Sequence, residues 1–253
     1  MKPTSPIPED SHTRKAARKR LLAGEAVVAL ALVATLAAHK FVPAALQPAT
    51  PLAMADGAHH ADFAGARPTE DVRQLANWTV FTGDHQDKAF VIVDKKDARV
   101  WVFDRAGHLK ANSPALLGSA IGDDNAPGIG DKPIAQVLPE ERTTPAGRYV
   151  AEMGMDTRGE DVVWVDYDAA VSMHRVLTTN PEERRLERLA SPGPDDNRIS
   201  YGCINLPRDF YETALAPTVR GEGAIIYVLP ETRPAQQVFG SWDVDHPRTL
   251  AQR

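Results

Sequence analysis

The chain of 253 residues is long enough for one large domain or two small ones, with material for a buried core. Its hydrophobic content of 43% and charged content of 25% are ordinary for a globular protein. The net charge of −5 is unevenly spread, because residues 1–40 carry +4 and the remainder carries −9. An acidic body argues against a nucleic-acid partner, which would bind a basic face.

The first 40 residues combine a basic stretch with an apolar one. Arg14–Arg20 is rich in Lys and Arg, and Ala26–Ala38 is an apolar run without a charge. This is the layout of an export signal. Counted from Leu21, the run also reaches the lower length limit of a membrane-spanning helix. A cleaved signal peptide and an uncleaved inner-membrane anchor both stay open, and both predict an exported body in the periplasm or cell envelope.

Residues 41–87 are predicted to form a Pro/Ala-rich linker that ends in a short helix. The prolines of this stretch stand among small and polar residues without apolar periodicity. The helix is predicted from Glu70 to about Trp78, with Thr69 as its N-cap. His59 and His60 lie in the linker without a cluster of carboxylates or cysteines at ligand spacing, so no metal site is predicted.

Residues 88–230 are predicted to form the main domain, because the hydrophobic period changes there to that of strands. The β-rich runs 89–93 and 99–103, joined by a polar turn, predict a hairpin. Further strands are expected at 116–122, 147–150, 162–165, 169–174 and 224–229, and helices at 181–190 and 207–216. Residues 123–142 favour a loop that acts as a lid over a site, and 231–253 an irregular tail. The strand-rich order predicts a mostly β or β-heavy α+β domain with a few short helices.

The only cysteine, Cys203, stands in the stretch Ile199–Pro207, where a buried strand is predicted to turn into a helix. Backbone N–H groups and a helix N-terminus meet at such a place, and they lower the pKa of a thiol and stabilise an oxyanion. An inert buried cysteine is the alternative, since free cysteine is among the most buried residue types. A single cysteine cannot form an internal disulfide, which leaves a free thiol in an exported body.

A catalytic cysteine needs a base, and His174 is the candidate. It alone among the eight histidines ends a predicted strand of the core, on the strand that precedes the cysteine segment. Two neighbouring strands would bring the imidazole and the thiol within hydrogen-bonding reach. A structural histidine is the alternative.

The stretch Ser200–Asn205, with His174 upstream, resembles the signature of the L,D-transpeptidase catalytic domain, also called the YkuD-like domain. The hairpin 90–103 and the turn Thr144–Gly147 agree with that family in their order along the chain. The resemblance covers roughly residues 88–230. It implies a β-sandwich-like fold and an exported enzyme that acts on peptidoglycan in cell-wall biogenesis.

The resemblance also implies a role for each residue of the site. Cys203 would attack the carbonyl of the third residue of a stem tetrapeptide, release the terminal D-alanine and pass the acyl group to an amine, with His174 as base. Backbone N–H groups near Tyr201, Gly202 and Cys203 would form the oxyanion hole, supported by Ser200. Asn205 would support the site or contact substrate, and we predict further substrate contacts for Arg198 and for Arg175, which stands where the family usually has Gly or Ser. No cofactor is implied.

Two departures from the family pattern leave alternatives open. The family has a histidine where Tyr201 stands, and tyrosine cannot take up a proton near neutral pH. The spacing from His174 to Cys203 is longer than usual, which we attribute to a surface insertion at 181–197. An acyltransferase is favoured over a carboxypeptidase or amidase that uses water, and over a non-catalytic cell-wall-binding relative. The oligomeric state is not predicted.

Overall fold

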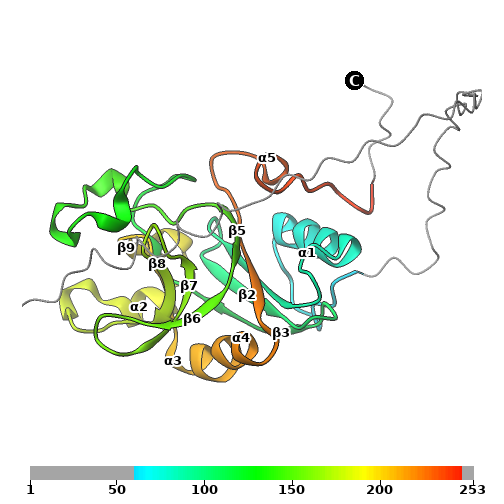
Figure 1. Cartoon of the computed structure of the whole chain (residues 1–253), viewed down its shortest axis with the longest axis horizontal. Helices are drawn as coiled ribbons and strands as arrows, with labels where there is room; N and C mark the ends of the chain where they lie inside the picture. Colours follow the sequence, from blue (N-terminus) through cyan, green and yellow to red (C-terminus); the bar gives the residue numbers. More distant parts are fainter. Residues whose placement is uncertain (1–59, 247–253) are drawn as a thin grey trace, which may run out of the picture. The chain divides into compact units, whose positions relative to one another are not determined.

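The computed structural model describes residues 60–246 (Figure 1). The predicted signal or anchor at 1–40, and the linker up to residue 59, lie outside the described residues. Within 60–246, no helix is long and apolar enough to cross a membrane.

Most strands of the described chain belong to two mixed sheets. The larger sheet has the order β3-β2-β1-β11-β5. Its strands are β1 (Ala89–Asp94), β2 (Arg99–Phe103), β3 (Leu109–Pro114), β5 (Gly147–Val150) and β11 (Ala224–Val228). As the sequence predicts, β1 and β2 form an antiparallel hairpin, whereas β11 pairs in parallel with β1.

The smaller sheet has the order β10-β8-β7-β6. Its strands are β6 (Glu152–Met155), β7 (Asp161–Asp166), β8 (Val171–Arg175) and β10 (Ile204–Leu206). A separate parallel ribbon joins β4 (Leu117–Gly118) to β9 (Arg198–Ser200). The segment between β9 and β10 carries the cysteine.

The side chains of β1 alternate between two hydrophobic cores. Val91 and Val93 face the core between the two sheets, to which β8 contributes Met173. Phe90 and Ile92 face the opposite side of the larger sheet, where they belong to a second core. Because successive side chains on a strand point to opposite faces, a strand that is apolar throughout is buried on both faces.

Helices cover both cores. The helix α1 (Glu70–Thr82) packs on the second core, and Thr69 caps it by accepting a hydrogen bond from the backbone N–H of Val72, as predicted. Figure 1 shows α1 on one side of the larger sheet and the smaller sheet on the other. The remaining helices are α2 (Arg185–Ala190), α3 (Arg208–Phe210), α4 (Ala216–Glu222) and α5 (Ala235–Phe239). A π-helical stretch, Tyr211–Leu215, joins α3 to α4.

The prediction of a strand-rich domain with few helices is confirmed, but several elements differ from expectation. The strands β6 and β10 were not predicted, α1 ends at Thr82 instead of near Trp78, and α5 lies within the predicted irregular tail. The expected strand 116–122 is reduced to β4, because the carbonyl of Gly122 accepts a hydrogen bond from the Lys95 ammonium instead of joining a ladder. The strand β3 was not expected, since its polar edge sequence lacks a β-rich run. The helix expected to end near residue 216 continues through α4.

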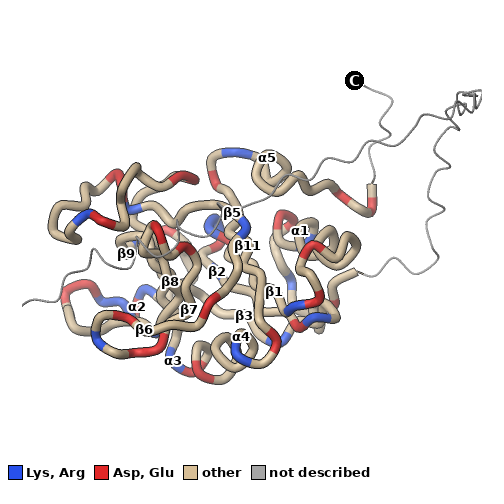
Figure 2. The backbone as a smooth tube through the Cα atoms, in the orientation of Figure 1, with Lys and Arg blue, Asp and Glu red and all other residues tan. Residues whose placement is uncertain are grey.

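Contacts cross both predicted boundaries of the main domain. On the N-terminal side, Leu75 of α1 is buried in the second core. On the C-terminal side, Glu231 pairs with Arg198 and Val244 joins the second core. Basic and acidic positions are interspersed over the described residues, where many of them form ion pairs (Figure 2). The boundaries at 88 and 230 stay predictions.

Candidate active site

The thiol of Cys203 lies beside β8 because of the register of the smaller sheet. The strands β10 and β8 are parallel, with Ile204 opposite Met173. Cys203, one residue earlier, therefore comes next to Ser172. Its Sγ lies 3.8 Å from the Ser172 Oγ and 3.6 Å from the carbonyl oxygen of Ala170, and the residue is half-buried.

The structure brings His174 to the same place. It lies two residues after Ser172 on β8, so the two side chains share one face of the sheet. The Nδ1 of His174 lies 2.8 Å from the carbonyl oxygen of Arg175. A carbonyl can only accept, so Nδ1 carries a proton, and Nε2 is the ring nitrogen left to exchange a proton with the thiol. The imidazole is thus held in the tautomer that a general base requires.

The pKa of the Cys203 thiol results from opposing effects. Burial by itself raises it. Hydrogen bonding and charge from His174, with a smaller effect from Ser172, outweigh burial and place the pKa below its ordinary value. A lowered pKa increases the fraction of thiolate, which is the nucleophilic form.

The loop that carries the nucleophile has a conformation that favours glycine. Gly202 has φ +129°, and a Cβ there would lie 2.8 Å from the carbonyl oxygen of Thr143. The Ser200 hydroxyl spans this loop, because it accepts from the Gly202 N–H at 3.1 Å and donates to the Cys203 carbonyl at 2.6 Å. The Gly202 N–H is therefore engaged by Ser200, and the oxyanion hole of Tyr201, Gly202 and Cys203 stays a prediction.

A second hydroxyl fixes the loop from the turn Thr144–Gly147. The Thr144 Oγ1 donates to the Gly202 carbonyl at 2.9 Å and accepts from the Gly118 N–H at 2.9 Å. The Thr144 carbonyl in turn accepts from the buried ammonium of Lys95 at 2.9 Å. The sequence predicts the turn but not its contact with Gly202, since the two segments are far apart along the chain.

Asn205 is buried under the nucleophile. Its Nδ2 donates to the Cys203 carbonyl at 3.2 Å, and its Oδ1 accepts from Arg185 at 2.6 Å. Arg185 belongs to α2, inside the segment predicted to be a surface insertion. That segment therefore contributes a side chain to the site, which sequence reasoning missed. A contact between Asn205 and substrate stays a prediction.

Both arginines assigned to substrate binding have partners within the protein. Arg198 pairs with Glu231 and donates to the carbonyl of Lys95 at 2.8 Å. Arg175 pairs with Asp161 at 2.9 Å and Glu212 at 2.7 Å. Their contacts with substrate stay predictions.

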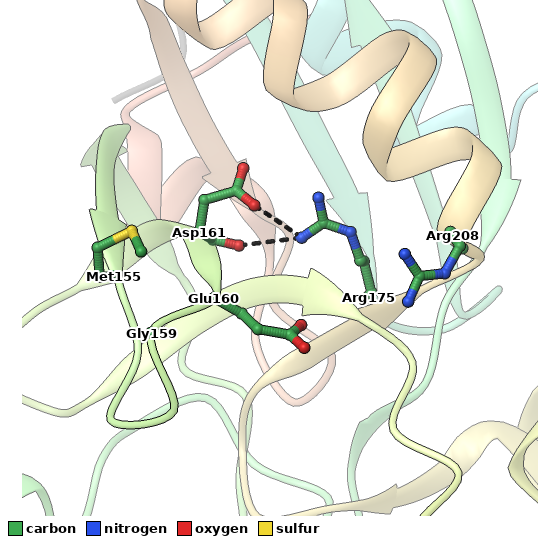
Figure 3. A pocket seen from close by; sticks show the side chains of 6 residues that line it. All are labelled: Met155, Gly159, Glu160, Asp161, Arg175 and Arg208. Atoms are coloured by element: carbon green, nitrogen blue, oxygen red, sulfur yellow. Dashed lines mark hydrogen bonds and ion pairs between the residues drawn. The ribbon is translucent and has the colours of Figure 1, made fainter.

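Arg175 also lines a pocket of about 350 Å³ (Figure 3). The pocket is bounded by Met155, Gly159, Glu160, Asp161, Arg175 and Arg208. Because neighbouring residues of a strand point to opposite faces, the Arg175 side chain points away from that of His174. The pocket therefore opens on the other side of β8 from the imidazole.

The loop 123–142 lies against two segments that neighbour the thiol. The Asn125 Nδ2 donates to the Asp166 carboxylate at 3.2 Å, next to the turn that leads into β8. At the other end, the Arg142 guanidinium lies over the ring of Tyr201, 4.2 Å from its centroid. A role of this loop as a lid stays a prediction.

The arrangement can perform nucleophilic chemistry on a carbonyl. It combines a thiol of lowered pKa, an oriented imidazole and a loop held by two hydroxyl groups. Among residues 60–246, no three His, Cys, Asp or Glu side chains gather as a metal site would need.

The comparisons with known proteins give structural neighbours only. No protein family matches the sequence, and no curated protein matches it. The fold is similar to the catalytic domain of the Enterococcus faecium L,D-transpeptidase, at 15% identity and a TM-score of 0.32, over 56% of this chain and 98% of that one. It is also similar to the Campylobacter jejuni helical cell shape determining protein Pgp2, at 16% identity and a TM-score of 0.37, over 58% of this chain and 50% of that one.

A further neighbour is the avibactam carbamoyl form of the enzyme Ldtfm, at 14% identity and a TM-score of 0.32, over 57% of this chain. The match spans 49% of the length of that enzyme. At such identities and scores the function has to be argued from the site itself.

Proposed function

We propose that this chain is an exported cysteine acyltransferase of the L,D-transpeptidase type, with peptidoglycan stem peptides as its substrates. The observation that carries the proposal is the half-buried thiol of Cys203, whose pKa His174 lowers. The resemblance of Ser200–Asn205 to the family signature supports the substrate class. The predicted signal or anchor at 1–40 supports export.

The proposed reaction has two halves. His174 Nε2 takes the thiol proton, and the thiolate attacks the carbonyl of the third residue of a tetrapeptide. The C–N bond to the terminal D-alanine breaks, its amine leaves with the proton from the imidazolium, and a thioester remains on Cys203. An amine acceptor then attacks the thioester, giving its proton to His174 and returning the thiol.

The surrounding residues hold the nucleophile in place. In the proposal, Ser200 and Asn205 fix the carbonyl of Cys203, and Thr144 fixes that of Gly202. This leaves the backbone N–H groups of Tyr201 and Cys203 as candidate donors to the oxyanion. A preorganised loop needs no rearrangement when charge develops in the transition state.

Hydrolysis is a second candidate, motivated by Tyr201, which stands where the family has a histidine. The Arg142 guanidinium lies over the ring of this tyrosine, and in this alternative the pair alters the access of an amine acceptor to the thioester. Water would then resolve the thioester and make the chain a carboxypeptidase or amidase. Product analysis with and without an added amine acceptor separates the two reactions.

The test uses the full chain with a purified tetrapeptide muropeptide. Intact-protein mass spectrometry should find an acyl adduct on Cys203, and D-alanine should be released. Cys203→Ala and His174→Ala should each abolish both signals. His108→Ala is the matched control, because this histidine lies exposed in a turn beside Asp104 and should leave both signals unchanged. A folded wild-type chain that gives neither adduct nor D-alanine overturns the proposal in favour of a non-catalytic relative.

A further inference from the structure

We infer that Arg142 binds a carboxylate next to the nucleophile and so selects acyl donors that end in a free carboxylate. Arg142 follows the short 3-10 turn Pro139–Glu141 at the end of the loop 123–142. The next residue, Thr143, places its carbonyl oxygen against Gly202, where a Cβ would meet it at 2.8 Å. The segment that carries Arg142 is thus in contact with the loop that carries Cys203.

The guanidinium of Arg142 is held in place, but most of its hydrogen-bond donors have no acceptor within the described residues. It lies over the ring of Tyr201, 4.2 Å from the centroid, which holds it close to the residues before Cys203. Within residues 60–246 its one hydrogen bond runs from Nη2 to the Val137 carbonyl at 3.2 Å. Its Nε is buried and has no acceptor among the described residues. A buried donor without a partner is uncommon in a folded protein and calls for an explanation.

The positive charge of Arg142 also lacks a carboxylate partner within residues 60–246, whereas the other arginines of the site have one. Arg175, Arg185 and Arg198 each pair with a carboxylate of the protein. No Asp or Glu within the described residues pairs with Arg142, although acidic residues outnumber basic ones in the chain. Guanidinium donors in a fixed plane match the two oxygens of a carboxylate, so a carboxylate ligand would bind at the terminal Nη1 and Nη2 groups and neutralise the charge.

The identity of the carboxylate rests on the proposed function. The D-alanine that would leave carries its carboxylate one residue beyond the attacked carbonyl, within about 4 Å along the backbone. A cation held next to the nucleophile loop is suited to bind that group. The stacking of Arg142 on Tyr201 would then give this tyrosine a role in substrate selection.

The first experiment tests the anion site without assuming the enzymatic reaction. The Cys203 thiol of the full chain is alkylated with iodoacetate, an anion, and with iodoacetamide, its neutral counterpart. A positive charge beside the thiol should favour iodoacetate, and Arg142→Gln should lower the ratio of the two rates by about tenfold. Arg142→Lys should retain part of the preference. Arg105→Gln, at an exposed arginine of another turn, should leave the ratio unchanged.

The iodoacetamide rate serves as the control for folding, since a neutral reagent is not attracted by the charge of Arg142 and any change in thiolate fraction cancels in the ratio of the two rates. An iodoacetamide rate like that of the wild type, together with an unchanged rate ratio in Arg142→Gln, overturns the inference.

The second experiment compares tetrapeptide donors that end in a carboxylate or in an amide. Arg142→Gln should lower kcat/KM by about 10-fold to 100-fold for the carboxylate donor and leave the amide donor nearly unchanged. An equal loss for both donors overturns the inference while the proposed function stands. A lower alkylation ratio in a chain that turns over neither donor supports the anion site and overturns the proposed function.

Discussion

The reactivity of Cys203 depends mainly on one neighbour, His174. Burial opposes ionisation of the thiol, and only the hydrogen bond and charge of His174, with help from Ser172, reverse that effect. The imidazole is in turn held by one backbone carbonyl, that of Arg175. Removal of His174 should therefore change the chemistry of the thiol more than the fold around it.

We predict that His174→Gln moves the pH midpoint of Cys203 alkylation upward, because the effects that lower the pKa of this thiol come mainly from the imidazole. Without the imidazole, burial and the two nearby oxygens remain, and neither Ala170 nor Ser172 supplies a positive charge. The measurement is the rate of iodoacetamide modification from pH 5 to pH 10. His108→Gln is the control, and an unshifted midpoint in His174→Gln would show that the thiol is not activated by this residue.

We predict that Gly202→Ala destabilises the chain and removes the thiol from its position. A side chain at φ +129° is strained by about 1–3 kcal/mol, and the new methyl group would meet the Thr143 oxygen at 2.8 Å. Urea unfolding measures the loss, and the alkylation rate reports on the thiol. Gly221→Ala is the control, because no atom lies within 4 Å of the added Cβ in α4, and it should stabilise the helix by about 0.5–1 kcal/mol. Equal effects of the two substitutions would contradict the strain argument.

At the scale of elements, a buried ion cluster links the parts of the site. The Lys95 ammonium, at the end of β1, donates to the carbonyls of Gly122 and Thr144 and to the Asp123 carboxylate. Its side chain is 0% exposed. Lys95 thereby joins the hairpin, the start of the loop 123–142 and the turn that holds Gly202.

We predict that Lys95→Met lowers the free energy of unfolding by about 3–5 kcal/mol, because it removes the nearest cation of the buried Asp123 carboxylate and leaves Glu231 with Arg198 alone. Lys96→Met is the neighbouring control. Its ammonium pairs with Asp71 but is 54% exposed, so its loss should cost at most about 1 kcal/mol. Chemical denaturation of both variants measures the difference, and similar losses would contradict the role of the buried cluster.

The same cluster predicts a dependence of stability on pH. Burial raises the pKa of Asp123, but hydrogen bonds from Lys95, Thr232 and the Glu231 backbone outweigh it and hold that pKa well below its ordinary value. The contribution of this carboxylate is thus complete above its unfolded pKa of about 4 and is lost as the pH falls toward its folded pKa. Urea unfolding at pH 3 and pH 7 should show that the stability gap between the wild type and Asp123→Asn shrinks in acid. A constant gap would contradict this account.

Local patterns predict only part of these elements. The hairpin β1–β2, the cap at Thr69 and the candidate pair Cys203 and His174 follow from short runs and a motif. The edge strand β3 and the contact of Arg185 with Asn205 do not, because they depend on distant segments that no local pattern relates. The unpaired guanidinium of Arg142 has no sequence signal at all, since an arginine in a polar loop is ordinarily solvated.

At the scale of the whole molecule, the larger sheet needs a cover on each face. The smaller sheet covers one face, and α1 covers the other. Sequence composition suggested that α1 belongs to a linker, because its neighbours are rich in proline. Its buried residues place it in the second core, together with Val244 from the C-terminal side.

We predict that a fragment of residues 88–230 is far less stable than a fragment of residues 60–246. The shorter fragment lacks Val72, Leu75 and Trp78, each of which contributes about 1.5–3 kcal/mol by burial. It also lacks Glu231, the partner of Arg198. Together these losses are comparable to the whole net stability of a domain, which is about 5–15 kcal/mol. The uncovered face of the larger sheet would expose Phe90 and aromatic neighbours to water, which favours aggregation.

Thermal unfolding followed by circular dichroism compares the full chain with both fragments. We expect the 60–246 fragment to unfold cooperatively at the temperature of the full chain, and the 88–230 fragment to show a broad transition or none. A third fragment, 60–230, distinguishes the contribution of α1 from that of the C-terminal residues, because it keeps α1 and loses Glu231 and Val244. Cooperative unfolding of 88–230 at the temperature of the full chain would mean that the second core adds no stability and that the boundaries predicted at 88 and 230 are those of the folding unit.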